Sequence, residues 1–230
     1  MELFATKILK NIDNEQFEKL VACLDSEKQR VIRSMKDADT VLTALTSALF
    51  IRYIIRQRLG LEQNEIHFGA YEYDKPYLIG NDTFHFNISH SGDFVVCAID
   101  ETPLGIDIEK IEYQNPKIVL DVLSEVELAQ YNKLSAKKKI PFFYSIWARK
   151  ESYLKALGMG LNTKLSDITV SSRNKIFSPV VRFVLSEKMH IKQYRASNNY
   201  ALAVCASHKN FPEKIERINM DEVLDLESLV

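Results

Sequence analysis

Glycine, proline and cysteine are scarce in this chain, and their scarcity excludes several kinds of protein. Seven glycines and six prolines are spread over 230 residues, so no low-complexity or linker segment divides the sequence. The three cysteines, Cys23, Cys97 and Cys205, form an odd set without a C-x-x-C pair. Nothing therefore indicates a disulfide framework or a zinc site. Cys97 in FVVCAI and Cys205 in LAVCAS are expected to be small buried residues.

The chain also lacks an excess of charge of either sign and lacks a long apolar run. Lysine and arginine total 30 against 31 aspartates and glutamates, which argues against the strong positive field that nucleic-acid binding needs. The most apolar stretch, VLTALTSALFIRYII, is interrupted by Arg52 and is too short for a membrane span. The first sixteen residues contain acids and no apolar core of a signal peptide. We expect a cytoplasmic protein with no nucleic-acid or membrane partner.

Hydrophobic residues make up 46% of the chain, enough to bury a sizeable core in one domain or two small ones. Apolar residues recur at helical spacing over 40–59 and stop at Gly60. The sequence predicts helices at 15–36 (in two pieces, capped at Asp25 or Ser26), 40–59, 115–134 and 140–161. It predicts strands at 66–73, 85–92, 94–100, 104–111, 166–171, 180–185, 190–196 and 200–206.

The second half of the chain repeats the order of the first. YALAVCAS at 200–207 echoes DFVVCAID at 93–100, and both long helices end in Leu-Gly before strands. This weak internal duplication predicts two similar α+β halves packed together. A site shared by two such halves would lie in the cleft between them.

Two acids lie one residue apart in the apolar segment GIDIEKI at 105–111. On a strand, Ile106 and Ile108 would point inward while Asp107 and Glu109 share the opposite face. A strand with one solvated face explains this pattern without any function. Two carboxylates so close repel each other unless a positive charge lies between them, so a site built around a metal or another cation stays open.

The segment WARKESYLK at 147–155 has a second unusual pattern. On a helix, Trp147, Glu151 and Lys155 lie one above the other along one face. An ordinary Glu–Lys pair on a solvated helix is the simplest interpretation. The neighbouring residues are aromatic and apolar, however, including Phe143 and Tyr153, and a core helix that places Glu and Lys beside Trp favours a site.

Together the two segments contain a ligand set for a hard cation. Asp107, Glu109 and Glu151 would supply three carboxylates, which suit Mg²⁺, an ion often completed by waters and substrate phosphate oxygens. Lys150 and Lys155 would then lie close enough to neutralise a pyrophosphate. Spacing alone leaves open whether the two segments meet.

Three segments, FNISHSGDFVVCAI, GIDIEKI and FYSIWARKESYLKALGMGL, resemble the signature segments of the 4′-phosphopantetheinyl transferases, specifically the surfactin-synthetase-activating (Sfp-type) branch. The resemblance also includes EYDKPY at 72–77 and NFPEKI at 210–215, so it covers most of the chain. It implies an enzyme that moves the phosphopantetheine arm of coenzyme A onto a serine of an apo acyl or peptidyl carrier protein, releasing adenosine 3′,5′-bisphosphate. Such transferases serve pathways such as nonribosomal peptide or polyketide biosynthesis.

The same resemblance implies an α+β fold and individual site residues. We expect a monomer that is a pseudo-dimer of two similar α+β halves, 1–103 and 104–230, with coenzyme A in the cleft between them. Magnesium is expected on Asp107, Glu109 and Glu151. Glu151 and Lys155 are expected to be catalytic. Glu151 would act as a ligand and as the base, or it would hold the water that is the base. Lys155 would lie near the pyrophosphate. Besides Lys150 and Lys155, coenzyme A contacts are implied for Lys28, Lys75, Ser89 and His90. Glu127 matches a family glutamate to which no role is assigned.

The sequence departs from the family pattern at two places. Asp74 precedes Lys75 where the family usually has glycine, and Thr43-Ala44 stand where it usually has an arginine that helps hold coenzyme A. Two other functions therefore stay open: a magnesium-dependent hydrolase that cleaves coenzyme A with water, and a non-catalytic module that binds carrier proteins. The intact acids argue against the second, because unpaired charges are costly to keep.

Overall fold

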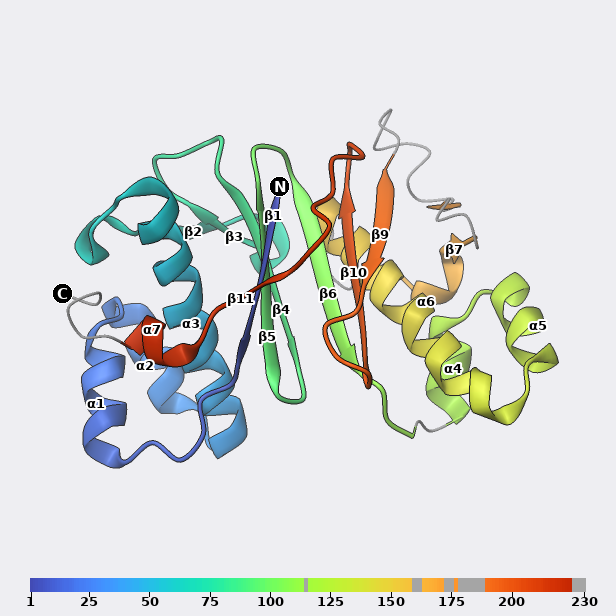
Figure 1. The fold of residues 1–230 in the computed structure, drawn as a ribbon, viewed down its shortest axis with the longest axis horizontal. Coiled ribbons are helices and arrows are strands. Elements are labelled where there is room, and N and C mark those ends of the chain that lie inside the picture. The colour runs from blue at the N-terminus through green and yellow to red at the C-terminus, as the bar shows by residue number, and fades with distance from the viewer. Residues whose placement is uncertain (114–115, 159–162, 172–175, 178–188, 225–230) are drawn as a thin grey trace.

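The computed structural model describes residues 1–113, 116–158, 163–171, 176–177 and 189–224. Its elements form four layers, with helices outside and two sheets between them (Figure 1). The blue-to-green first half contributes one helical layer and one sheet, and most of the remaining chain contributes the other two layers. The expected α+β fold of two similar halves is confirmed.

The first half builds a mixed sheet covered by three helices. Its elements are β1 (Glu2–Lys7), α1 (Asn14–Ala22), α2 (Ser26–Ser34), α3 (Ala38–Leu59), η1 (Gln63–Glu65), β2 (Phe68–Ala70), η2 (Glu72–Asp74), β3 (Pro76–Leu78), β4 (His85–Ser91) and β5 (Phe94–Asp100). The sheet order is β11-β1-β5-β4. The side chains of Asp13, Asp25 and Asp37 each accept a backbone N–H at the start of α1, α2 and α3, which fixes where these helices begin.

The second half builds an antiparallel sheet covered mainly by α6. Its elements are β6 (Leu104–Lys110), α4 (Pro116–Val122), α5 (Glu125–Lys133), α6 (Ala136–Leu157), η4 (Leu165–Asp167), β7 (Thr169–Val170), β8 (Ile176–Phe177), β9 (His190–Tyr194) and β10 (Tyr200–Ala206). The sheet order is β6-β10-β9, and α6 packs across β6 and β10.

The long helices and central strands of the two halves correspond. Helices α3 and α6 each have 22 residues, and each ends at a left-handed glycine, Gly60 and Gly158, with φ of 67°. Strands β5 and β10 are each flanked by two antiparallel neighbours. Their cysteines, Cys97 and Cys205, are fully buried. The duplication suggested by the two apolar segments is therefore present in the fold.

Three apolar clusters hold the layers together. One lies between α3 and the first sheet, a second between α6 and the second sheet, and a third between the two sheets. Ile106 and Ile108 belong to the third cluster, as the alternation in GIDIEKI predicts. The opposite face of β6 is not a solvated face, because α6 covers it and Asp107 is only 3% exposed.

Helix α3 is the one helix among the described residues that is long and apolar enough to cross a membrane by length and composition. Half of its most apolar window is buried inside the protein. Leu45, Leu49 and Ile55 are fully buried in the first cluster, which is the packing of a core helix.

Strands β4 and β6 lie side by side at the junction of the halves, and side chains join them. Every second residue of β4 accepts a hydrogen bond from every second backbone N–H of β6: Asn87 Oδ1 from Ile106 (2.8 Å), Ser89 Oγ from Ile108 (3.4 Å) and Ser91 Oγ from Lys110 (2.9 Å). We call these three residues the polar row of β4. They satisfy edge-strand donors that no backbone partner meets.

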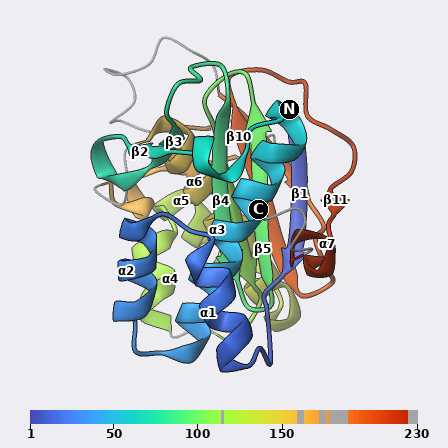
Figure 2. The ribbon, with the colours of Figure 1, turned by 90° about the vertical axis from the view of Figure 1, so that its left-hand side faces the viewer.

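The end of the described chain returns to the first half. Strand β11 (Glu216–Arg217) pairs in parallel with β1, and α7 (Met220–Leu224) packs against α3. Figure 2 views the first half from its helical side and shows α7 beside β11. Ile218, Met220 and Val223 belong to the first-half core. The expectation that all of 104–230 forms the second half is therefore wrong for residues 216–224.

Several expected elements differ in detail. Strand β1 was not predicted, and the strand expected at 66–73 consists of β2 followed by the short helix η2. The helix expected at 115–134 is divided into α4 and α5, because Ser124 caps the start of α5. Helix α6 begins at Ala136 instead of 140, and residues 166–171 form η4 and β7. The strand expected at 180–185 lies outside the described residues.

Candidate active site at the junction of the halves

Close packing of α6 on β6 brings the two unusual sequence segments together. A Cβ atom at Gly105 would lie 2.0 Å from the backbone oxygen of Ser152, so only glycine permits this contact. Strand β6 carries Asp107 and Glu109, and α6 carries Glu151 and Lys155. The segments GIDIEKI and WARKESYLK therefore meet, which their spacing alone left open.

Asp107 is the centre of the hydrogen bonds at this junction. Its Oδ1 accepts hydrogen bonds from Lys155 Nζ at 2.6 Å and Ser89 Oγ at 2.9 Å. Lys155 Nζ also donates to Ser89 Oγ at 2.9 Å. The other oxygen of Asp107 is buried and has no hydrogen-bond partner within the described residues. One oxygen is thus fixed by a cation, and the other is buried with no partner among the described residues.

The pKa values of all three carboxyl groups at the junction are raised. Burial, and then the charges of Asp107 and Glu151, raise the pKa of Glu109 to about 8. Burial and the charge of Asp107 raise the pKa of Glu151. Burial also raises the pKa of Asp107, although Lys155 opposes this change. The cluster holds more negative charge than Lys155 alone neutralises, so a further cation would stabilise it.

The described residues do not form a ready-made metal site. No group of three or more histidine, cysteine, aspartate or glutamate side chains within them is arranged closely enough to hold a metal ion. Lys155 pairs with one oxygen of Asp107. The charge of Asp107 raises the pKa of both Glu109 and Glu151, although the three acids do not form a closed set of ligands.

Residues of β4 complete the site from the first half. Ser89, for which a contact to the nucleotide is expected, donates to Asp107 and accepts from Lys155. The ring of His90 is exposed, and desolvation together with the positive charge of Lys155 lowers its pKa. Asn87 and Ser91 were not singled out from the sequence. Their alternation with Ser89 in FNISHSG was the available signal, because residues i, i+2 and i+4 share one face of a strand.

The structure contradicts the expectation that Lys150 neutralises a pyrophosphate. Lys150 is 0% exposed and its Nζ donates to Glu127 Oε2 at 2.5 Å, Val122 O at 2.6 Å and Leu165 O at 2.9 Å. All three of its donors are therefore used inside the second half.

Glu127 has a structural role in this same arrangement. Besides Lys150, its two oxygens accept the backbone N–H groups of Ser124 and Val170. The pair thus fixes the start of α5 and strand β7 against α6.

Two other lysines lie away from Asp107. Lys75 Nζ donates to the backbone oxygens of Leu104 (2.9 Å) and Lys155 (2.7 Å), so its ammonium is engaged by the protein. Lys28 is partly buried in the first half, where burial and the charge of Arg52 lower its pKa. Neither is seen to join the hydrogen bonds around Asp107 within the described residues.

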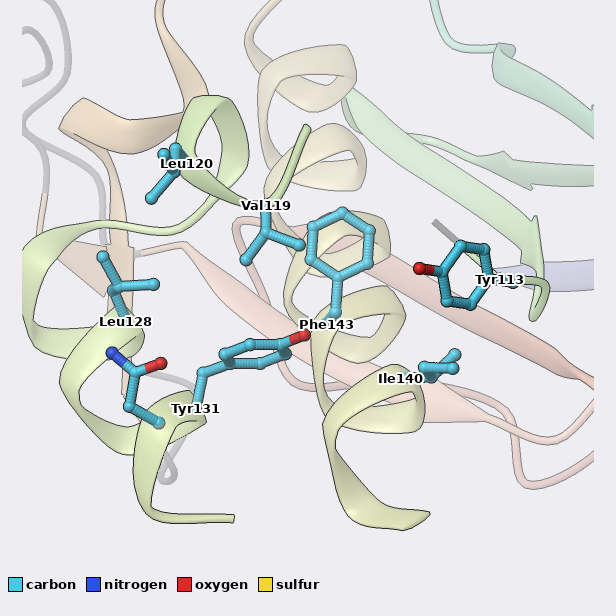
Figure 3. Close-up of a pocket in the computed structure, with 8 residues that line it drawn as sticks. Tyr113, Val119, Leu120, Leu128, Tyr131, Ile140 and Phe143 are labelled. Carbon is cyan, nitrogen blue, oxygen red and sulfur yellow. The ribbon is translucent and has the colours of Figure 1, made fainter. Parts of the chain in front are cut away.

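A separate apolar pocket of about 330 Å³ lies in the second half, with side chains from α4, α5 and α6 directed toward it (Figure 3). It is lined by Tyr113, Val119, Leu120, Leu128, Tyr131, Asn132, Ile140 and Phe143. No charged side chain is among these residues, so the pocket cannot hold a pyrophosphate without unpaired charge. The chemistry is therefore assigned to the junction and not to this pocket.

Comparisons with known proteins show the family of this chain. The family model described as 4′-phosphopantetheinyl transferase superfamily matches residues 103–205, and the model described as 4′-phosphopantetheinyl transferase, N-terminal, matches residues 11–102. The two matches meet in the turn between β5 and β6.

Relatives in the curated proteins match nearly the whole chain. A 4′-phosphopantetheinyl transferase of Bacillus subtilis is 30% identical over 224 residues, covering 97% of this chain and 100% of the relative. The 4′-phosphopantetheinyl transferase Sfp of Bacillus subtilis (strain 168) is 31% identical over 227 residues, with the same coverage.

Among solved structures, a holo-(acyl-carrier-protein) synthase from Bacillus anthracis in complex with coenzyme A is 24% identical. The match covers 45% of this chain and 93% of that chain, with a TM-score of 0.38. The two full-length relatives decide the family. The chain is a member of the 4′-phosphopantetheinyl transferase superfamily.

Proposed function

We propose that the chain transfers the 4′-phosphopantetheine arm of coenzyme A to a serine of an apo acyl or peptidyl carrier protein, and that the reaction takes place at Asp107, Glu109, Glu151 and Lys155. The observation that carries this proposal is the meeting of β6 and α6 at the junction of the halves. Family membership supplies the reaction, and this cluster is where the described residues combine buried acids with a lysine that is 30% exposed.

The donor atoms at the junction are of the type that magnesium prefers, although within the described residues they are not arranged as a closed set of ligands. Mg²⁺ prefers hard oxygen ligands and keeps several waters, and the buried, unpartnered oxygen of Asp107 is such a ligand. Burial and neighbouring carboxylates raise the pKa values of Glu109 and Glu151, so a bound cation would favour their charged forms. We propose that Asp107, Glu109 and Glu151 hold the ion. When bound, it would neutralise the pyrophosphate and the charge that gathers on the leaving phosphate.

The chain's own residues have separate tasks in the transfer. Glu151, whose pKa is raised by burial and by Asp107, takes the proton from the serine Oγ of the carrier. The Oγ forms a bond to the phosphorus that carries the pantetheine arm. The bond from this phosphorus to the bridging oxygen breaks, and adenosine 3′,5′-bisphosphate leaves with the electron pair. Lys155 faces the phosphate oxygens and offsets their charge.

One mass-spectrometric experiment tests this function against its two alternatives. The purified protein is mixed with coenzyme A, MgCl₂ and a panel of apo carrier proteins, with an EDTA-treated control. Transfer predicts a gain of the phosphopantetheine mass on the carrier together with release of the nucleotide. Nucleotide release without a gain in carrier mass would instead establish a hydrolase, and carrier binding without either product would establish a binding module.

We also propose that the protein acts as a monomer in the cytoplasm, without nucleic-acid or membrane partners. Both halves that build the junction belong to one chain, so the site needs no second copy. The three cysteines are free, which suits a reducing compartment. Light scattering after size-exclusion chromatography tests the first point, and a dimer of constant mass over a dilution series would contradict it.

A further inference from the structure

Lys75 is a residue of the first half whose side chain ends in the second half. It lies between η2 and β3, whereas both of its hydrogen-bond acceptors, Leu104 O and Lys155 O, belong to β6 and α6. It also borders a pocket of about 320 Å³ that contains Tyr77, Phe86 and Gly158. Its long side chain therefore crosses from one half to the other beside the candidate site.

The two acceptors are the ends of the elements that carry the acids. Leu104 is the first residue of β6, and Lys155 lies in the last turn of α6. Carbonyl groups in the last turn of a helix lack partners within the helix, and a cation there interacts favourably with the helix dipole. The ammonium of Lys75 thus ties the C-terminal end of α6 to the start of β6.

A tie at this position would limit movement of α6 along β6. Gly105 sets the distance between the two elements, because its missing side chain lets Ser152 approach. That close contact does not by itself prevent movement along the helix axis. A shift of one helical residue is a translation of about 1.5 Å, and a catalytic group misplaced by about 1 Å can cost about a hundredfold in rate.

We propose that Lys75 is a positioning residue for phosphopantetheine transfer: it holds α6 on β6 so that Glu151 and Lys155 face Asp107 and Glu109, and it does not bind coenzyme A. This inference rests on the proposed function. It replaces the coenzyme A contact expected from the sequence, since both acceptors of the Lys75 ammonium are backbone oxygens of β6 and α6. Burial lowers the pKa of Lys75 to about 8, which agrees with a side chain that ends inside the protein and not in solvent.

The test compares Lys75→Met with Lys192→Met. Lys192 is a matched control, because its Nζ also donates to a backbone oxygen, that of Pro212, at 2.8 Å, but on β9 and away from α6. For Lys75→Met we expect kcat to fall about 10- to 100-fold, while the KM and Kd for coenzyme A stay within about twofold. Lys75→Arg should recover part of kcat, and Lys192→Met should leave kcat and KM nearly unchanged.

Two results would overturn the proposal. One is a tenfold or greater rise in the Kd for coenzyme A with kcat retained at saturation, which is what a direct ligand would show. The other is a Lys75→Met variant whose kinetics equal those of Lys192→Met.

If Lys75→Met does not fold, NMR of the unmodified protein provides a second test. In protein labelled with ¹⁵N at lysine Nζ, adding coenzyme A and MgCl₂ should move the Lys155 resonance and leave that of Lys75 in place. A large shift of the Lys75 resonance would contradict the proposal. Failure of the proposed function is a different outcome, since the unmodified protein would then add no mass to any carrier.

Discussion

Asp107 is held in place by groups from both halves although its burial is unfavourable. Ser89 of β4 and Lys155 of α6 share one of its oxygens, and the other oxygen is buried without a hydrogen bond. Burial raises its pKa, so the folded protein keeps this charge at a cost. Costly charges of this kind collect at functional sites, which supports a role for Asp107 in binding a cation.

Replacing Asp107 by asparagine tests this role. Asp107→Asn keeps the shape of the side chain but removes the charge, so we expect phosphopantetheine transfer to fall at least about a hundredfold. The midpoint of thermal unfolding should fall little or rise, because a buried charge has been removed. Asp93→Asn is the control, since Asp93 lies in an exposed pair with Lys10. Transfer within tenfold of the unmodified protein would contradict the assignment of Asp107.

The lowered pKa of Lys75 predicts that the stability of the protein depends on pH. Its pKa is about 8 in the folded protein, below the ordinary lysine value of 10.5. Between these two values the unfolded chain binds a proton that the folded protein has released, so this lysine makes stability rise with pH. The full effect is at most about 3 kcal/mol.

Urea unfolding at pH 7, 8, 9 and 10 measures this effect. The free energy of unfolding of the unmodified protein should rise relative to that of Lys75→Met across this range. A constant difference between the two proteins would show that Lys75 titrates normally when folded.

At the scale of the elements, two faces of α6 make different contacts: one meets the acids of β6, and the other meets Glu127. Glu151 and Lys155 are four residues apart and point toward β6, whereas Lys150 is about 140° away from Lys155 around the helix. This angle explains why Lys150 meets Glu127 instead of the acids of β6. The helical period therefore contained enough information to exclude Lys150, but its charge and its nearness in sequence suggested the opposite.

Removing Lys150 should affect stability and not catalysis. Lys150→Met leaves Glu127 charged and buried, and breaking a buried pair in this way costs about 3–5 kcal/mol. We expect this loss in urea unfolding, with kcat of the folded protein changed less than about threefold. The double variant Lys150→Met/Glu127→Gln should be more stable than Lys150→Met, because no unpaired charge remains. A loss of transfer at unchanged stability would return Lys150 to the active site.

The hydrogen bonds from β6 to the polar row of β4 predict how the contact between the two halves responds to a substitution. In Asn87→Ala the buried N–H of Ile106 loses its partner, which costs about 1–3 kcal/mol. Hydrogen exchange measured by NMR should therefore be faster at Ile106 in this variant. Exchange at Cys97, within the β5 ladder of the first sheet, is the internal reference. Equal exchange rates for Ile106 before and after the change would show that water already replaces Asn87.

At the scale of the whole molecule, local patterns predict the two halves, but they do not predict that residues 216–224 return to pack on the first half. The repeated order of elements, the long helices ending at glycine and the strands β4, β5 and β6 could be predicted, because each has a periodic or capping signal. Strand β1 could not, because four consecutive residues, Leu3 to Thr6, are buried and no alternation remains. The return of β11 and α7 to the first half depends on tertiary packing, which no local period reports.

Because β11 and α7 return to the first half, we predict that the two halves unfold together. Met220 lies in the second part of the chain but packs in the core of the first half, and truncating a buried methionine costs about 2–5 kcal/mol. Trp147, the single tryptophan of the chain, lies on α6 and reports on the second half. In Met220→Ala we therefore expect the urea midpoint from Trp147 fluorescence to fall by the same amount as the midpoint from far-ultraviolet circular dichroism. Leu120→Ala, at a 59% exposed position on α4, should leave both midpoints nearly unchanged. If the fluorescence midpoint stays in place while the circular dichroism midpoint falls, the halves are independent folding units, and neither the returning segment nor the polar row of β4 couples them.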